Sequence, residues 1–260
     1  MNIPNFKDYN PSYAPADEKL SPERAQSLDQ LTKLIDGLVS DEELTRPTLL
    51  RYLNANKWDV KSAFKALSST QDWRKEFKVK DLVASDFFTE GETGKIYCNG
   101  FSNENNPILY LTPSRQNSND TAANLRFIVY SVELAICMLP PGVDKLLVVI
   151  DLRGYSPRQS SFSSEARQLI TIFADHYPER LSRVILLKAS WIFSTFFKLA
   201  SPFIDPVTRN KIFFSSLSKP DASHIHNFVP KQALSKEFGG ESEFEYKGPA
   251  YFKHAESFFR

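Results

Sequence analysis

Residues able to do covalent chemistry occur in this chain, but not at the spacings that catalysis needs. The sequence contains no G-x-S-x-G, so it offers no nucleophile elbow for a hydrolase. Gly91 to Lys95 is glycine-rich like a phosphate-binding loop, yet that motif needs glycine at 89 and serine or threonine at 96, where Thr89 and Ile96 stand. No G-x-G-x-x-G follows an expected strand. We therefore expect a protein that is not an enzyme.

Histidine and aspartate are also poorly placed for a metal or an acid–base pair. His176 stands beside Tyr177, and His224 and His226 are two residues apart, but neither pair reaches the ligand count of a metal or haem centre. Asp151 ends an apolar run, where α/β folds often carry catalytic acids, without a partner base that its spacing would identify. We expect no metal and no cofactor.

A polar turn near residue 208 brings a hydroxyl and a cation together. Asp205 and Pro206 are typical of a helix N-cap and first helical position. Thr208 and Lys211, three residues apart, then share one face of the turn. Spacing alone favours an ordinary solvated surface for both.

The elements that would position these residues change period along the chain. Up to about residue 85 the apolar residues recur at helical spacing, with Ser21 and Asp59 as N-caps. Beyond that point short β-branched runs alternate with helix-length segments, which predicts an α/β layer with a mostly parallel sheet covered by helices. The expected strands are Ile96–Cys98, Ile108–Thr112, Leu146–Leu152, Val184–Lys188 and Ile212–Ser215, and the expected helices are Thr121–Leu139, Ser164–Tyr177 and Asp221–Phe228.

This pattern divides the chain into four parts. We expect an extended arm over residues 1–20, an N-terminal helical unit over 21–85, an α/β domain over 86–245 and a tail over 246–260. Gly239 and Gly240 end the recognisable domain.

Composition excludes some classes of partner. The formal net charge is +1, with 32 basic and 31 acidic residues, so no global field favours nucleic acid or an anionic membrane. The two cysteines, Cys98 and Cys137, form no disulfide framework, which is typical of a reducing compartment. No signal peptide and no apolar run of about 18 residues is present, so we expect a soluble cytoplasmic protein whose membrane contacts are local and apolar.

The most unusual segment is Trp191–Ala200. Its phenylalanine and aliphatic residues recur at helical spacing but cover more than one face. Such a helix either is buried on most sides as part of an ordinary core or covers an apolar molecule that is not protein.

Two long stretches carry a resemblance to a known family. Leu49–Phe77, LLRYLNANKWDVKSAFKALSSTQDWRKEF, and Asp175–Phe214, which includes Tyr-Pro-Glu-Arg and Asp-Pro-Val-Thr, resemble the CRAL-TRIO lipid-transfer family over residues 40–240. The likeness is to its secretory-type phosphatidylinositol transfer proteins. It implies a lipid-binding α/β domain behind a small helical unit, which extracts one lipid from a membrane into an apolar cavity and exchanges it for a second lipid.

The resemblance also implies which residues bind the lipid. Glu179, Thr208 and Lys211 match the residues that hold the phosphoinositol headgroup, where a lysine supplies charge to the phosphodiester and the other two exchange hydrogen bonds with inositol hydroxyls. The apolar helix becomes a gate over the cavity that opens transiently at internal membranes, with Pro202 and Pro206 as hinges. The residues assigned to this gate and pocket are Trp191, Phe193, Phe196, Phe197, Phe203 and Ile204.

This chain departs from the family in two places. Asn54-Ala55-Asn56-Lys57 stands where the family often carries arginines, so phosphate contact there would be weaker or would rest on Lys57. The pocket for a second ligand is assigned to Ser156, Tyr110 and Cys137, where a thiol attracts a choline cation far less than an aromatic ring. The identity of the second lipid, sterol or phosphatidylcholine, therefore stays open. Two alternative functions also stay open: a carrier of sterol or another apolar ligand such as haem, and a lipid-sensing adaptor that does not transfer lipid.

Overall fold

A computed structural model describes residues 4–12, 19–36, 44–155, 162–188, 206–215 and 223–259, with the backbone alone described at 162–167, 223–224 and 259. The chain forms two compact units, which are described separately. The helical unit comprises residues 15–81 and 168–180. The sheet unit comprises residues 1–14, 82–167 and 181–260.

The helical unit is built on three amphipathic helices, α1 (Pro22–Ile35), α2 (Arg46–Ala55) and α3 (Val60–Phe77), followed by the 3₁₀ turn η1 (Val79–Asp81). The expected caps are confirmed: the Ser21 side chain accepts from the Arg24 amide and the Asp59 side chain from the Ser62 amide. The apolar faces of the three helices pack into one core, whose buried members are Leu28, Leu31, Leu49, Tyr52, Leu53, Ala63 and Leu67.

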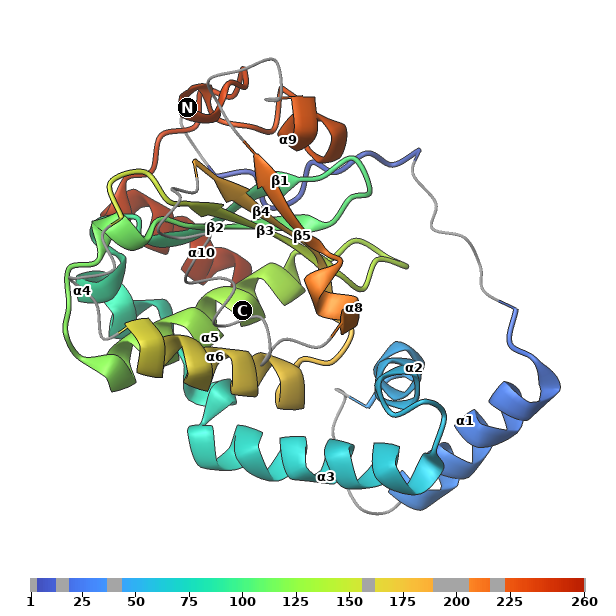
Figure 1. The fold of residues 1–260 in the computed structure, drawn as a ribbon. Coiled ribbons are helices and arrows are strands. Elements are labelled where there is room, and N and C mark those ends of the chain that lie inside the picture. The colour runs from blue at the N-terminus through green and yellow to red at the C-terminus, as the bar shows by residue number, and fades with distance from the viewer. Residues whose placement is uncertain are drawn as a thin grey trace. The chain divides into compact units, whose positions relative to one another are not determined.

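The sheet unit contains five strands in the order β1-β2-β3-β4-β5, with β1 antiparallel to β2 and the other pairs parallel (Figure 1). The α/β class predicted from the sequence is therefore confirmed. The strands are β1 (Ile96–Phe101), β2 (Pro107–Leu111), β3 (Leu146–Asp151), β4 (Leu181–Leu187) and β5 (Ile212–Ser215). The other elements are η2 (Ala84–Phe87), α4 (Phe88–Gly91), η3 (Pro113–Arg115), α5 (Thr121–Cys137), α6 (Phe162–His176), α8 (Pro206–Arg209), α9 (Ser223–Phe228), η7 (Lys236–Phe238) and α10 (Gly248–Phe259).

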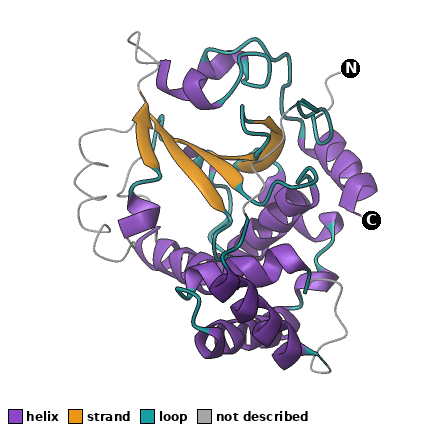
Figure 2. Cartoon of the chain, turned by 90° about the vertical axis from the view of Figure 1, so that its right-hand side faces the viewer, coloured by secondary structure: helices purple, strands orange, loops and turns teal. Residues whose placement is uncertain are grey.

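Helices lie on both faces of this sheet, with α5 on one side and α9 on the other (Figure 1, Figure 2). On the α5 side, the Cys98 thiol donates to the Ser131 carbonyl at 3.3 Å, which joins β1 to the middle of α5. On the α9 side, the ring of Phe228 packs on Phe213 of β5 and lies under the Arg183 guanidinium of β4. Because side chains alternate along a strand, each strand contributes to both layers.

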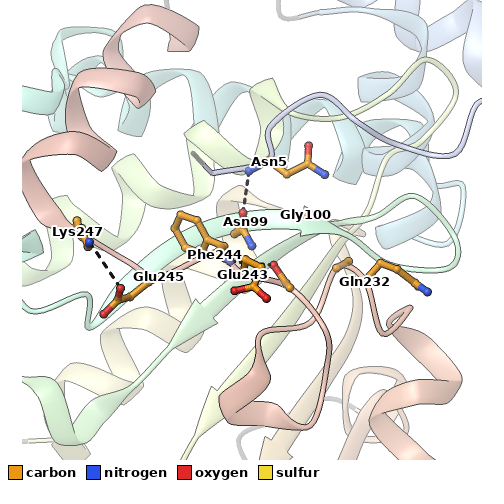
Figure 3. A pocket seen from close by; sticks show the side chains of 10 residues that line it. Asn5, Asn99, Gly100, Gln232, Glu243, Phe244, Glu245 and Lys247 are labelled. Atoms are coloured by element: carbon orange, nitrogen blue, oxygen red, sulfur yellow. Dashed lines mark hydrogen bonds and ion pairs between the residues drawn. The ribbon is translucent and has the colours of Figure 1, made fainter. Parts of the chain in front are cut away.

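The N-terminal arm lies along the edge strand β1. The Gly100 amide donates to the Asn5 carbonyl at 2.8 Å, and the Asn5 amide donates to the Asn99 side chain at 2.7 Å (Figure 3). Phe6 is 3% exposed and packs against Tyr251 of α10. The arm thus covers backbone groups that an open sheet edge would expose.

These contacts change the expected division of the chain. The arm groups with the sheet unit rather than standing apart, because Phe6 and the Asn5 backbone bind to it. The expected tail forms α10, whose Phe252 packs on Phe88 and Phe127, so it is part of the sheet unit's core. Residues 168–180 group with the helices, because the end of α6 is hydrogen-bonded and stacked on α3.

Candidate functional site

One face of β3, β4 and β5 is apolar and, apart from the buried Leu186, only half-buried or exposed. Val148 and Ile150 of β3, Val184 of β4 and Ile212 of β5 share this face by their strand registers and are half-buried, and Phe214 is 43% exposed. On the opposite face of β3 and β4, Leu147, Val149, Ile185 and Leu187 are each 0% exposed. We call the half-buried set, Val148, Ile150, Val184, Ile212 and Phe214, the open sheet face. An apolar surface of this kind at the centre of a sheet is suited to cover by an apolar ligand.

Thr208 and Lys211 lie at the amino end of β5. Thr208 is in the single turn α8, and its carbonyl accepts from the Lys211 amide at 3.0 Å. The Lys211 carbonyl in turn accepts from the Val184 amide at 2.9 Å, which ties this turn to the edge of β4. Both side chains are half-buried. These two predicted site residues therefore lie close together in the turn that leads into β5.

Glu179 belongs to the helical unit, in the turn that follows α6. Its backbone is left-handed, with φ +58°, a conformation that costs a residue other than glycine of order 1–3 kcal/mol. The turn is closed by the Arg180 amide, which donates to the Tyr177 carbonyl at 3.3 Å. Among the described residues, five others that are not glycine also have a positive φ, including Lys78 at the C-cap of α3, so the backbone conformation of Glu179 fits a turn that ends a helix.

A groove of about 420 Å³ in the helical unit borders this turn. It is formed by the end of α2, one side of α3 and the segment 174–178, so Pro178 in its wall is followed directly by Glu179. The lining residues are Tyr52, Ala55, Asn56, Ser62, Lys65, Ala66, Ser69, Ala174, Asp175 and Pro178. Sequence reasoning identified Asn56 but missed Lys65, Ser62 and Ser69, whose spacing on α3 would have placed them on one side of that helix.

A buried polar network fixes the wall of the groove. The Tyr52 hydroxyl donates to the Thr70 hydroxyl at 2.8 Å, and Thr70 contacts the Asp175 carbonyl at 3.2 Å. Burial, opposed by the hydrogen bond to Thr70, raises the pKa of Tyr52 above its usual value. The network joins α2, α3 and the segment before Glu179, so the groove is held by three elements.

The other predicted lining residues lie elsewhere. The gate residues Trp191, Phe193, Phe196, Phe197, Phe203 and Ile204, together with Ser156, are outside the described residues. Tyr110 is 2% exposed and its ring is stacked between Tyr97 and Phe238, with centroids 5.0 and 5.7 Å away. Both faces of the Tyr110 ring are therefore occupied by protein, which gives no support to its assignment to a ligand pocket. Cys137 is exposed at the end of α5.

Two residues singled out for chemistry have structural partners. Asp151 is buried and accepts a paired set of hydrogen bonds from the Arg153 guanidinium, at 2.7 to 3.0 Å. Lys95 in the glycine-rich loop is buried and donates to Gln116 and Asn124 at 2.7 and 2.6 Å. Both groups are satisfied by protein contacts of the sheet unit.

A second groove, of about 470 Å³, runs beside β1 in the sheet unit (Figure 3). Its acidic side chains are already paired, Glu245 with Lys247 at 3.7 Å and Glu243 with Lys236. We therefore regard it as a solvated surface groove next to the N-terminal arm.

The described part of the chain shows no group of three or more histidine, cysteine, aspartate or glutamate side chains arranged to hold a metal ion. Within the same residues, no helix combines the length and the apolar character needed to cross a bilayer.

Comparison with known proteins is consistent with this architecture. The family model described as CRAL/TRIO domain matches residues 91–240, and that described as CRAL/TRIO, N-terminal domain matches residues 23–69. A crystal structure of Sfh5 has the same fold, with a TM-score of 0.69 at 16% identity, over 90% of this chain and 92% of that one.

Curated relatives are similar at the level of sequence. A CRAL-TRIO domain-containing protein of Schizosaccharomyces pombe is 37% identical over 209 residues, which are 80% of this chain and 20% of that protein. Phosphatidylinositol transfer protein PDR17 of Saccharomyces cerevisiae is 35% identical over 251 residues, 91% of this chain and 70% of the relative. SEC14 cytosolic factor of Kluyveromyces lactis is 30% identical over 246 residues, 86% and 80% of the two chains. Since a family model covers more than half of its residues, this chain belongs to the CRAL/TRIO family.

Proposed function

We propose that this protein is a phosphatidylinositol transfer protein, which extracts one lipid from a membrane and exchanges it for another without chemical reaction. Relatives that carry this name include the PDR17 protein of Saccharomyces cerevisiae and the CSR1 protein of Eremothecium gossypii. The proposal extends their named activity to this chain.

The open sheet face is the observation that carries the proposal. Five apolar side chains from three parallel neighbours are half-buried or exposed there, while Leu147, Val149, Ile185 and Leu187 on the opposite face of β3 and β4 are 0% exposed. Acyl chains laid on this face would be removed from water at a gain of about 0.8 kcal/mol per CH₂. Retention of the lipid therefore depends on this surface, whatever its headgroup.

The headgroup is assigned to Glu179, Thr208 and Lys211. Thr208 and Lys211 supply a hydroxyl and a cation at the amino end of β5, and Glu179 supplies a carboxylate from a strained turn. A cation suits the phosphodiester, and a carboxylate and a hydroxyl suit the ring hydroxyls of inositol. These three residues would determine which headgroup is bound, whereas the open sheet face would bind the acyl chains.

The second ligand is proposed to be an apolar molecule such as a sterol rather than phosphatidylcholine. A choline cation is held by open aromatic faces, and both faces of the Tyr110 ring are covered. Cys137, the other described position assigned to this pocket, offers a thiol.

The direct test is mass spectrometry of the lipids that the purified protein retains after incubation with mixed membranes. We expect enrichment of phosphatidylinositol together with one apolar lipid. Retention of phosphatidylcholine alone, or of haem with its absorption band, would contradict the proposal. Slow exchange of a bound phosphatidylinositol would indicate a lipid-sensing adaptor instead.

The double variant Glu179→Ala with Lys211→Ala separates headgroup selection from binding of the apolar part of the lipid. We expect it to abolish phosphatidylinositol transfer and to leave transfer of the second ligand and the folded state intact. Equal loss of both transfer activities would contradict the assignment of these residues to headgroup selection.

A further inference from the structure

Among the described residues that line the groove of the helical unit, one side chain is cationic. Lys65 projects from α3 between Ser62 and Ser69, and it is exposed. Within the described ranges it takes part in no ion pair or hydrogen bond. Its ammonium is therefore available to a ligand without first breaking a contact inside the protein.

The polar residues that line this groove come from different helices. Lys65 and the two serines come from α3, whereas Asp175 comes from the last turn of α6. The side-chain amide of Asn56 donates to the Tyr52 carbonyl at 2.8 Å, which orients it within the wall. A cation, two hydroxyls and a carboxylate around one groove suit a molecule that carries both a phosphate and hydroxyl groups.

The size of the groove is suited to a small polar ligand. Its volume of about 420 Å³ lies within the range of roughly 300–1,000 Å³ that is usual for ligand sites. The wall bearing Asp175 is held by the hydrogen bond from Thr70, and the wall bearing Lys65 is a long helix. The site is thus largely formed before a ligand arrives, which limits the ordering cost of binding.

We propose that this groove binds a phosphorylated polyol, with Lys65 as the residue that supplies the positive charge to its phosphate. The inference rests on the proposed function, since the inositol headgroup of a lipid has this chemistry, and a free inositol phosphate shares it. It identifies where the chain obtains a charge that Asn54 and Asn56 do not provide: the cation comes from α3 rather than from the end of α2. Asp175 would accept from ring hydroxyls and repel a misoriented phosphate.

The experiment titrates glycerophosphoinositol, the headgroup without acyl chains, into the full-length protein by calorimetry. We expect Lys65→Ala to weaken binding about tenfold, as is typical for loss of one charged hydrogen bond, and Lys65→Arg to restore most of it. Lys75→Ala removes the same charge from an exposed position of α3 outside the groove and serves as the matched control. Binding that falls equally in the Lys65→Ala and Lys75→Ala variants, or no binding to the wild type, would overturn the proposal.

A parallel assay of phosphatidylinositol transfer between vesicles identifies the source of the phosphate. If Lys65→Ala lowers both transfer and glycerophosphoinositol binding, the groove serves the lipid headgroup. If it lowers only glycerophosphoinositol binding, the groove serves a free phosphorylated polyol. Wild-type transfer without any effect of Lys65→Ala in either assay would sink this inference and leave the proposed function standing. If glycerophosphoinositol binding depends on Lys65 but the wild type does not transfer phosphatidylinositol, this inference stands and the proposed function is contradicted.

Discussion

The imidazole of His176 stacks on the indole of Trp73, with ring centroids 4.1 Å apart and planes 9° from parallel. His176 Nδ1 also lies 3.2 Å from the Thr70 hydroxyl. These contacts hold the last turn of α6 against α3, directly before the turn that carries Glu179. The turn that carries Glu179 is therefore supported by a titratable side chain.

Acid should loosen this support. Burial lowers the pKa of His176 below its ordinary value of 6.5, with Arg74 acting in the same direction and Asp175 opposing. The unfolded chain then binds the proton more readily, so the stability that the neutral ring contributes is complete above about pH 6.5 and declines as the pH falls through the lower folded pKa. We expect the free energy of unfolding, measured with denaturant, to be lower at about pH 5.5 than at about pH 7.5. This difference should be smaller in His176→Phe, which keeps an aromatic stack. An unchanged pH dependence in this variant would contradict the role of His176.

The open sheet face can be tested by filling it. We expect Val148→Phe to reduce the amount of lipid bound per protein, because the added ring occupies space on the half-buried face, with little loss of stability. Val149→Phe, on the neighbouring residue of the same strand, adds the same group to a position that is 0% exposed and should cost about 1–3 kcal/mol by overpacking. Lipid counts and denaturant midpoints of the two variants provide the comparison. Similar destabilisation by both would show that the two faces are packed alike.

Glycine at position 179 should separate folding from function. Glu179 has φ +58°, which glycine adopts without steric cost. We expect Glu179→Gly to leave the free energy of unfolding unchanged or to raise it by about 1 kcal/mol, while phosphatidylinositol transfer is lost with the carboxylate. Glu179→Ala, which keeps the strain, should lose transfer equally. A Glu179→Gly variant that still transfers phosphatidylinositol would contradict the headgroup assignment.

Gly240 should tolerate no side chain. A Cβ at this position would lie 1.9 Å from the Leu234 carbonyl oxygen, a backbone atom that cannot rotate away. We expect Gly240→Ala to lower the free energy of unfolding by about 1–3 kcal/mol. The matched control is Gly239→Asn, because Gly239 has φ +84°, which asparagine tolerates better than most residues, and a Cβ there would only make an ordinary contact with His226 Nε2 at 3.8 Å. Thermal or denaturant unfolding of the two variants measures the difference, and equal stability would contradict the close approach.

Local signals in the sequence determined the elements of this protein. Ser21 and Asp59 mark helix starts because their side chains accept from amides three residues on, and both caps form. The alternation of β-branched runs with helical segments identified a mostly parallel sheet, since parallel neighbours require crossover connections. The motifs around Glu179 and Thr208 identified the family. All of this depends on residues close together in the chain.

The tertiary structure decided what distant residues do together. The arm carries no periodicity, yet Phe6 is buried against α10, a contact between opposite ends of the chain that no local pattern encodes. Tyr110 appeared available to a ligand, but rings from β1 and η7 cover both of its faces. Lys65 was not singled out from the sequence, and it lines a groove because the segment 174–178 packs beside α3. The burial of a side chain and the residues that it contacts depend on long-range packing. The sequence therefore predicted the helices and strands, whereas only the tertiary structure showed the surroundings of these residues.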